Sequence, residues 1–82
     1  MNSAIFLEWL MNDKKMSIRS AKDVLSRCSR IYRMLDINSL DSNTLENLQN
    51  NEEFENSSMF IKSQLKRAVV LCLEFMNSTD RE

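Results

Sequence analysis

The sequence predicts a small all-α protein, a bundle of four or five helices, and three observations support this fold class. The chain has 82 residues, which is one domain at most, because typical domains have ~100–150 residues. It contains 0 Gly and 0 Pro, and tight β-hairpin turns depend on such residues. Apolar residues recur at spacings of three and four in two long segments, the period of an amphipathic helix.

The first two expected helices are separated by a polar turn. The first spans residues 2–12, with Ser3 as N-cap and an apolar face of Ile5, Phe6, Trp9 and Leu10. The second spans residues 18–35 and follows Ser17, a good N-cap residue. Its apolar residues lie within about ±60° of one direction; they are Ala21, Val24, Leu25, Cys28, Ile31, Tyr32 and Leu35.

A short helix and a long helix are expected in the second half. Residues 44–50 form the short one, which presents Leu45 and Leu48 to the core, while Leu40 anchors the loop before it. Residues 50–56 are polar and acidic, with Phe54 as their one apolar anchor. The last helix begins after Ser57 or Ser58, and its inner face comprises Ile61, Leu65, Ala68, Val69, Cys72, Phe75 and Met76. We expect a single domain over residues 1–76 and a polar, frayed tail over residues 77–82.

The composition disfavours an enzyme. With 0 His, the chain lacks a His-based catalytic triad and a His-containing zinc site, and with 0 Gly it lacks the common phosphate-binding loops. No residue has a general-base partner that spacing can identify, so we expect no catalytic residue, metal, cofactor or small-molecule substrate. Cys28 and Cys72 fall on apolar helix faces, where they are expected as buried thiols; a disulfide between them is the alternative.

The sequence indicates a cytoplasmic protein that does not bind membranes. The first residues have no basic segment typical of a signal peptide. The longest apolar run, Ala68–Leu73, is six residues long, far short of the ~20 needed to span a bilayer.

The net charge of −1 conceals a strong segregation of charge. Seven basic residues and one acidic residue lie between Lys14 and Arg33, whereas six acidic residues and no basic one lie between Met34 and Met59. On the second helix, four cations fall within about ±40° of one direction, opposite the apolar stripe; these are Arg19, Lys22, Arg30 and Arg33, with Ser26 among them and Arg27 at the edge. We call these four residues the cationic row.

The cationic row admits two interpretations. A solvated helix face is one, because outward faces are normally charged. Such faces usually mix signs, however, since opposite charges at i,i+4 are stabilising and like charges are not. A row of one sign is expected of a helix that meets phosphates, where Arg can also reach base edges in the major groove.

Two further surfaces suggest a protein partner. The acidic stretch is either a solubilising loop or a surface for a basic partner, carried by Asp41, Glu46, Glu52, Glu53 and Glu55. Residues 68–73 are apolar on every side of the last helix, so they are either buried on several sides or meet another protein. On the second interpretation Val70, Leu71 and Leu73 form a contact with a second copy or another protein.

Six segments between about Phe6 and Met76 combine apolar positions at helical period with helix caps. They are Phe6-Leu7-Glu8-Trp9-Leu10, Lys14-Lys15-Met16-Ser17, Ser20-Ala21-Lys22-Asp23-Val24, Ser26-Arg27-Cys28-Ser29-Arg30, Ser63-Gln64-Leu65-Lys66-Arg67-Ala68 and Leu73-Glu74-Phe75-Met76. Together these segments resemble the N-terminal, SAM-like core-binding domain of tyrosine recombinases and phage integrases.

The resemblance implies a helical bundle that clamps DNA with its long helices and touches neighbouring protomers. Carried over to this sequence, the DNA-contacting positions are Lys14, Lys15, Arg19, Lys22, Arg27, Arg30, Arg33, Lys62, Lys66 and Arg67. The family's catalytic domain, with its tyrosine nucleophile and its Arg and His activators, has no counterpart here, so strand transfer is excluded for this chain alone. The sequence therefore predicts a non-catalytic module that binds duplex DNA. The alternative is a small protein-interaction module, such as a phage or mobile-element inhibitor of a larger nucleic-acid enzyme.

Overall fold

The computed structural model describes residues 3–79 of the chain, which contain five helices and no strand. They are α1 (Ser3–Asn12), α2 (Ile18–Leu35), α3 (Thr44–Gln49), α4 (Glu52–Glu55) and α5 (Met59–Thr79). The all-α bundle that the sequence predicts is thus confirmed, with five helices.

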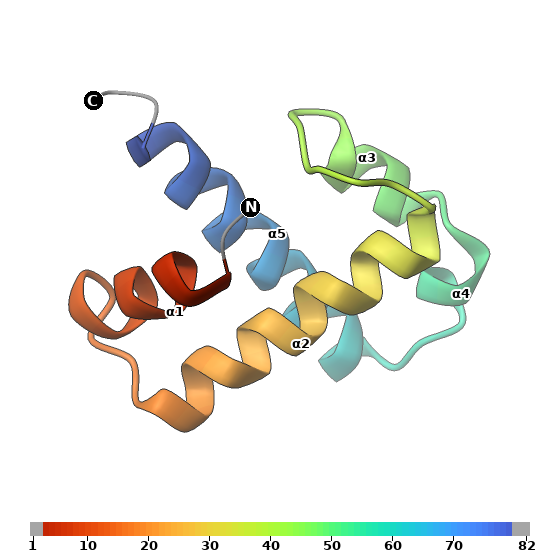
Figure 1. Ribbon diagram of the computed structural model, residues 1–82. Helices are drawn as coiled ribbons and strands as arrows, with labels where there is room; N and C mark the ends of the chain where they lie inside the picture. The colour runs from red at the N-terminus through yellow and green to blue at the C-terminus, as the bar shows by residue number, and fades with distance from the viewer. Residues whose placement is uncertain (1–2, 80–82) are drawn as a thin grey trace.

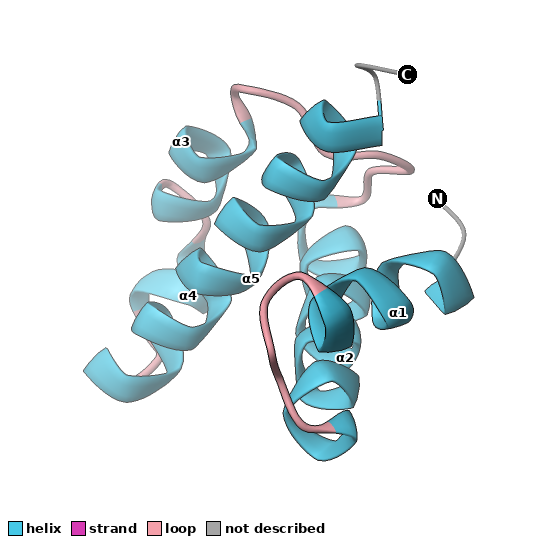
Figure 2. Cartoon of the chain, turned by 90° about the vertical axis from the view of Figure 1, so that its left-hand side faces the viewer, coloured by secondary structure: helices cyan, strands magenta, loops and turns pink. Residues whose placement is uncertain are grey.

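The long helices α2 and α5 pack against each other and cross at the centre of the molecule (Figure 1). Viewed from the side, α1 lies to the right of α5 and α3 to its left (Figure 2). Both α1 and α3 also pack against α2, so the two long helices are the frame on which the short elements rest.

Local signals account for α2. The Ser17 hydroxyl oxygen accepts a hydrogen bond from the Ser20 backbone N–H at 3.2 Å, the N-cap that the sequence predicts. Asp36 ends the helix in the left-handed conformation, with φ of 54°, and its N–H donates to the Tyr32 carbonyl. The residues of the predicted stripe are buried or half-buried, with Ala21 and Ile31 fully inaccessible.

Small side chains line the contact between α2 and α5. Ala21, Cys28, Ala68 and Cys72 are each at most 2% exposed. The Cys28 thiol donates to the Ala68 carbonyl across the interface, with 3.7 Å between sulfur and oxygen. A side chain of one helix thus reaches the backbone of the other, which only small residues allow.

An aromatic cluster fixes α1 to the end of α5. The Phe6 and Phe75 ring centroids are 5.0 Å apart, and the Trp9 centroid is 5.4 Å from that of Phe75. Phe6 and Leu10 are fully buried, but Ile5 is 51% exposed, so its expected place on the apolar face is wrong. Ile5 lies about 100° around the helix from Phe6, on the side away from the core.

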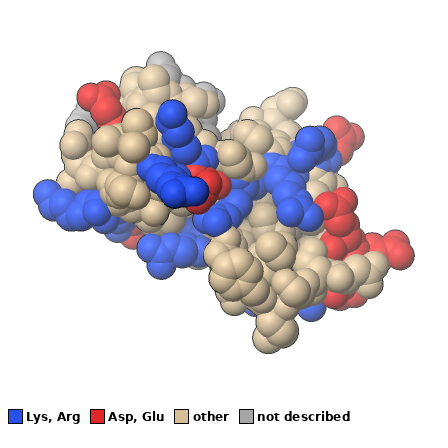
Figure 3. Space-filling model, turned by 90° about the horizontal axis from the view of Figure 1, so that it is seen from below, with Lys and Arg blue, Asp and Glu red and all other residues tan. Residues whose placement is uncertain are grey.

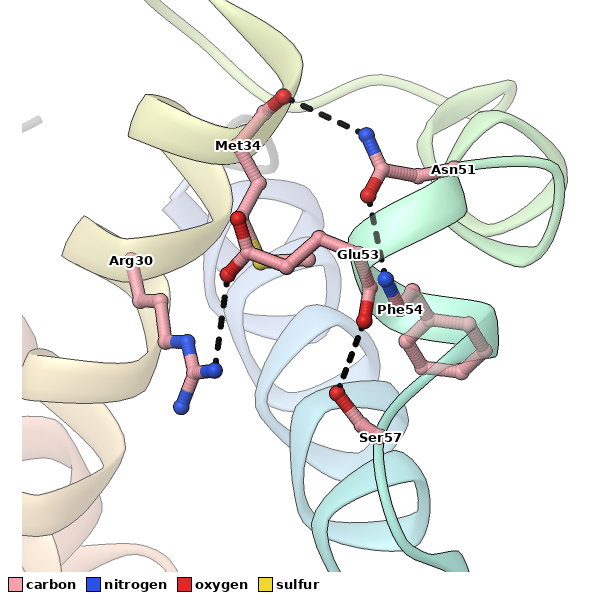
Figure 4. A network of polar contacts seen from close by, with 6 residues as sticks. All are labelled: Arg30, Met34, Asn51, Glu53, Phe54 and Ser57. Carbon is pink, nitrogen blue, oxygen red and sulfur yellow. Dashed lines mark hydrogen bonds and ion pairs between the residues drawn. The ribbon is translucent and has the colours of Figure 1, made fainter.

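A helical turn follows α3, in a segment for which the sequence predicts only a polar, acidic stretch. This turn, α4, is held by Asn51, whose side-chain oxygen accepts from the Phe54 N–H at 3.1 Å and whose amide donates to the Met34 carbonyl at 3.3 Å (Figure 4). The same side chain therefore caps α4 and satisfies a free carbonyl at the end of α2. Phe54 is buried, as its anchoring role predicts.

The last helix begins where expected and extends further. The Ser58 hydroxyl accepts from the Ile61 N–H at 3.2 Å, so Ser58 is the cap. The helix continues past Met76 to Thr79, so residues 77–79 of the expected tail are helical. The rest of that tail, residues 80–82, lies outside the described residues, as do residues 1–2. None of the described helices has the length and apolar character needed to cross a bilayer.

Replacing Phe6 by Ala is expected to lower the free energy of unfolding by about 3–5 kcal/mol, because it empties the centre of the aromatic cluster. Urea unfolding followed by circular dichroism measures the change. Phe6→Leu, which keeps most of the volume, is expected to cost about 1–2 kcal/mol and keeps the test valid if the Ala variant does not fold. The exposed neighbour provides the control, since Ile5→Ala is expected to cost less than about 1 kcal/mol. Equal losses at the two positions would contradict the burial described here.

Candidate nucleic-acid interface

The cationic row lies on the outward face of α2. Arg19, Lys22 and Arg33 are exposed, and so is Ser26 between them, whereas Arg30 is half-buried. Lys15 is exposed in the turn that leads into α2, where its φ of 57° places it in the left-handed region. Lys66 and Arg67 of α5 are also exposed.

A groove of about 320 Å³ between α2 and α5 brings Arg27 and Arg67 together at one site. Its other lining residues are Met16, Ser20, Asp23, Val24 and Gln64. Both arginines are among the expected DNA contacts, but nothing in the sequence pairs them, because they are 40 residues apart in the chain. The groove therefore presents two guanidinium groups and two neutral polar side chains above an apolar floor, with one carboxylate beside them.

One face of the molecule collects much of this positive charge. Seen from below, Lys and Arg side chains extend from the left across the middle, while most of the acidic side chains gather at the right (Figure 3). The right-hand part of this view corresponds to α4, which carries Glu52, Glu53 and Glu55. The charge segregation of the sequence is thus preserved as two regions of the folded surface.

Three of the expected DNA-contacting cations already have partners within the chain. Lys14 forms an ion pair with Glu74, and its Nζ lies 5.4 Å from the centre of the Trp9 ring. This pair lies in a second hollow, of about 400 Å³, where the ends of α1 and α5 meet. The Arg30 guanidinium lies 3.4 Å from the Glu53 carboxylate, and Lys62 Nζ lies 5.9 Å from the centre of the Phe54 ring.

The remaining cations make no ion pair within the described part of the chain. They are Lys15, Arg19, Lys22, Arg27, Arg33, Lys66 and Arg67. Because these seven side chains form no ion pair with a described residue, they are the strongest candidates to contact an anionic partner.

The acidic residues have local structural roles that do not depend on a binding partner. Asp41 accepts from the Asn43 N–H at 2.9 Å and from the Thr44 hydroxyl at 3.3 Å, and its own N–H donates to the Thr44 oxygen at 2.9 Å. Glu46 and the three glutamates of α4 lie in the first turns of their helices, where negative charge is favourable. All five expected acidic residues are exposed, and only Glu53 forms an ion pair within residues 3–79.

The expected apolar patch on α5 is smaller than the sequence suggests. Val70 is 50% exposed, Leu73 is half-buried against the core, and Leu71 is buried. Leu71 therefore belongs to the core and cannot be part of an exposed patch, because α5 is covered on that side. A more exposed apolar pair, Met59 and Phe60, lies at the start of the same helix and is absent from the sequence-based expectations. Their position beside a cap residue, before the inner face begins at Ile61, is the signal that could have revealed them.

The two cysteines are buried and form no disulfide with each other. A hydrogen bond with Cys72 and burial together raise the pKa of the Cys28 thiol. Burial, with the two thiols nearby, raises the pKa of Tyr32 to about 12. Neither thiol is placed for chemistry, and no group of three or more His, Cys, Asp or Glu residues within residues 3–79 could hold a metal ion.

Comparisons with known proteins give no relative for this chain. No protein-family model matches it, and neither does any curated protein or solved structure. The resemblance to recombinase core-binding domains thus stays a prediction from the sequence.

Alkaline pH is expected to destabilise the protein through Tyr32. Because the folded state favours the neutral phenol, the free energy of unfolding is unaffected by this group below pH 10.0 and falls as pH rises towards 12. Tyr32 is the only tyrosine, so tyrosinate absorbance measures its titration directly. Tyr32→Phe is expected to lose less stability than the wild type over this range. A phenol that titrates near pH 10.0 would contradict the burial described for it.

Proposed function

We propose that this chain is a non-catalytic module that binds duplex DNA through the outward face of α2 and the groove that α2 forms with α5. The observation that carries the proposal is the placement of Arg27 and Arg67 on that one groove, next to cations that have no acidic partner within residues 3–79. Arginine suits this role because its planar guanidinium group can donate two hydrogen bonds to one phosphate.

The dimensions of α2 fit a DNA groove. Its 18 residues give a length of about 27 Å at 1.5 Å per residue. The major groove is about 12 Å wide and admits one α-helix. In this arrangement, exposed cations on α2 contact phosphates on either side, while Arg27 and Arg67 hold one phosphate at the edge of the helix.

The acidic side of the molecule orients the complex. A net charge of −1 is low for a DNA-binding domain taken as a whole. Six of the 12 acidic residues lie between Asp36 and Glu55, however, a segment that includes α3 and α4 and has no basic residue. Repulsion from DNA therefore turns that end away and leaves the α2 side facing the phosphates. The resemblance to integrase core-binding domains supports the same surface, because it assigns DNA contacts to the two long helices.

Replacing Arg27 and Arg67 together by Gln is expected to weaken duplex binding and to reduce its salt dependence. Log affinity falls with log salt, and each lost phosphate contact makes this slope shallower by about 0.9. Fluorescence anisotropy of a labelled duplex across a salt series measures both quantities.

The matched variant Lys14→Gln with Arg30→Gln has the same net charge. It is expected to lose less affinity, because both side chains already pair with carboxylates. Equal losses in the two double variants would show that only net charge matters and would reject the groove. Absence of wild-type binding at low salt would reject the proposed function.

A protein-interaction module is the second candidate, favoured by the 50% exposure of Val70 in the middle of α5. Val70→Glu is expected to abolish self-association or partner binding while the circular dichroism spectrum stays unchanged, because the side chain is not part of the core. Sedimentation velocity at several concentrations measures self-association. A wild-type chain that is monomeric at every concentration and retains no partner contradicts this candidate.

A further inference from the structure

Phe60 is the largest apolar side chain that the described surface leaves exposed. It is 68% accessible, and its neighbour Met59 is 79% accessible. Every other phenylalanine of the chain is buried, at 6% exposure or less. The ring is therefore available for contact with a ligand.

The position of Phe60 links it to the groove. Phe60, Gln64 and Arg67 follow each other at spacings of four and three, so they share one face of α5. Gln64 and Arg67 line the groove opposite Arg27. Phe60 therefore lies one helical turn beyond the α5 wall of the groove, at the end of the cationic surface.

The charges around Phe60 favour a polyanionic ligand that arrives from the α2 side. Arg67 and Arg27 lie towards α2, and neither forms an ion pair within residues 3–79. The three glutamates of α4 directly precede the start of α5 in the chain, five to eight residues before Phe60. A phosphate backbone is attracted along the groove and repelled beyond Phe60, so it is expected to turn away at the ring.

The size of the patch favours a single flat ring over a second protein surface. A standard protein interface buries about 800 Å² per partner, whereas one aromatic side chain offers roughly 150–250 Å². Ile61, the next residue, packs against the core, and the three residues after it, Lys62, Ser63 and Gln64, are polar. A nucleobase matches the ring in size and shape, and base stacking on aromatic side chains is a common mode of binding unpaired nucleotides.

We propose that Phe60 stacks on an unpaired base, so that the chain prefers DNA in which a duplex adjoins an unpaired nucleotide. The duplex lies along α2, its phosphates enter the Arg27–Arg67 groove, and the first unpaired base lies on the Phe60 ring. This inference rests on the proposed function and specifies the class of DNA that the same surface binds.

The test compares two labelled DNAs by fluorescence anisotropy, a continuous duplex and the same duplex with a one-nucleotide gap. The wild type is expected to bind the gapped DNA about five-fold or more tightly than the duplex, the range that loss of one stacked base covers. Phe60→Ala is expected to abolish this preference and to bind the duplex as the wild type does. Phe60→Trp is expected to keep the preference, because indole also stacks. Both variants should fold normally, which circular dichroism checks, since the side chain is exposed.

The outcomes separate this inference from the proposed function. Equal wild-type affinity for the two DNAs overturns the stacking role and leaves duplex binding in place. Absence of binding to either DNA overturns both. A wild-type dimer that Phe60→Ala converts to a monomer in sedimentation velocity, without a change in preference for gapped DNA, overturns the inference in favour of a contact between two copies of the chain.

Discussion

The packing of α2 on α5 over small side chains is the contact on which the rest of the structure depends. Cys28 of α2 contacts both Ala68 and Cys72 of α5, and the Cys28 sulfur lies 3.7 Å from the Ala68 backbone oxygen. An 82-residue chain has a small core, so few positions can be spared. At this separation the rims of the two helices form the groove that holds Arg27 and Arg67. Larger residues at the contact would separate the helices and, with them, the two arginines.

Contacts at the two ends of the frame then divide the charged residues into two groups. At one end the aromatic cluster brings α1 to α5 and pairs Lys14 with Glu74. At the other end Asn51 fastens α4 to α2, which places Glu53 beside Arg30 (Figure 4). Exposed ion pairs of this kind contribute little to stability. Their larger consequence is that Lys14 and Arg30 are already paired with carboxylates. The cations in the middle of the basic face form no such pair and remain available to bind a partner.

Prediction from sequence succeeds here where the physical cause is local. The Ser17 cap and the apolar stripe of α2 depend on neighbours within one or two turns, and the structure agrees with both. It fails for α4, a four-residue helix with too few residues to display a period, whose cap Asn51 also bonds to a distant carbonyl. It also fails for Ile5, which is exposed, and for Leu71, which is buried. Both lie at the edge of an apolar stripe, where the position of a neighbouring helix decides whether a side chain is buried.

By itself the sequence determined the fold class, the identity of the long helices and the separation of basic from acidic segments. Each of these follows from residue type and from spacings of three and four, which act within a helix. Only the tertiary structure decided which cations share a site, which are already paired, and which apolar residue stays in water. Those properties depend on how segments far apart in the chain are packed together, as in the groove that Arg27 and Arg67 both line and the ion pair of Lys14 with Glu74. The helical period specifies the direction of a side chain from its own axis, and helix packing decides what lies in that direction.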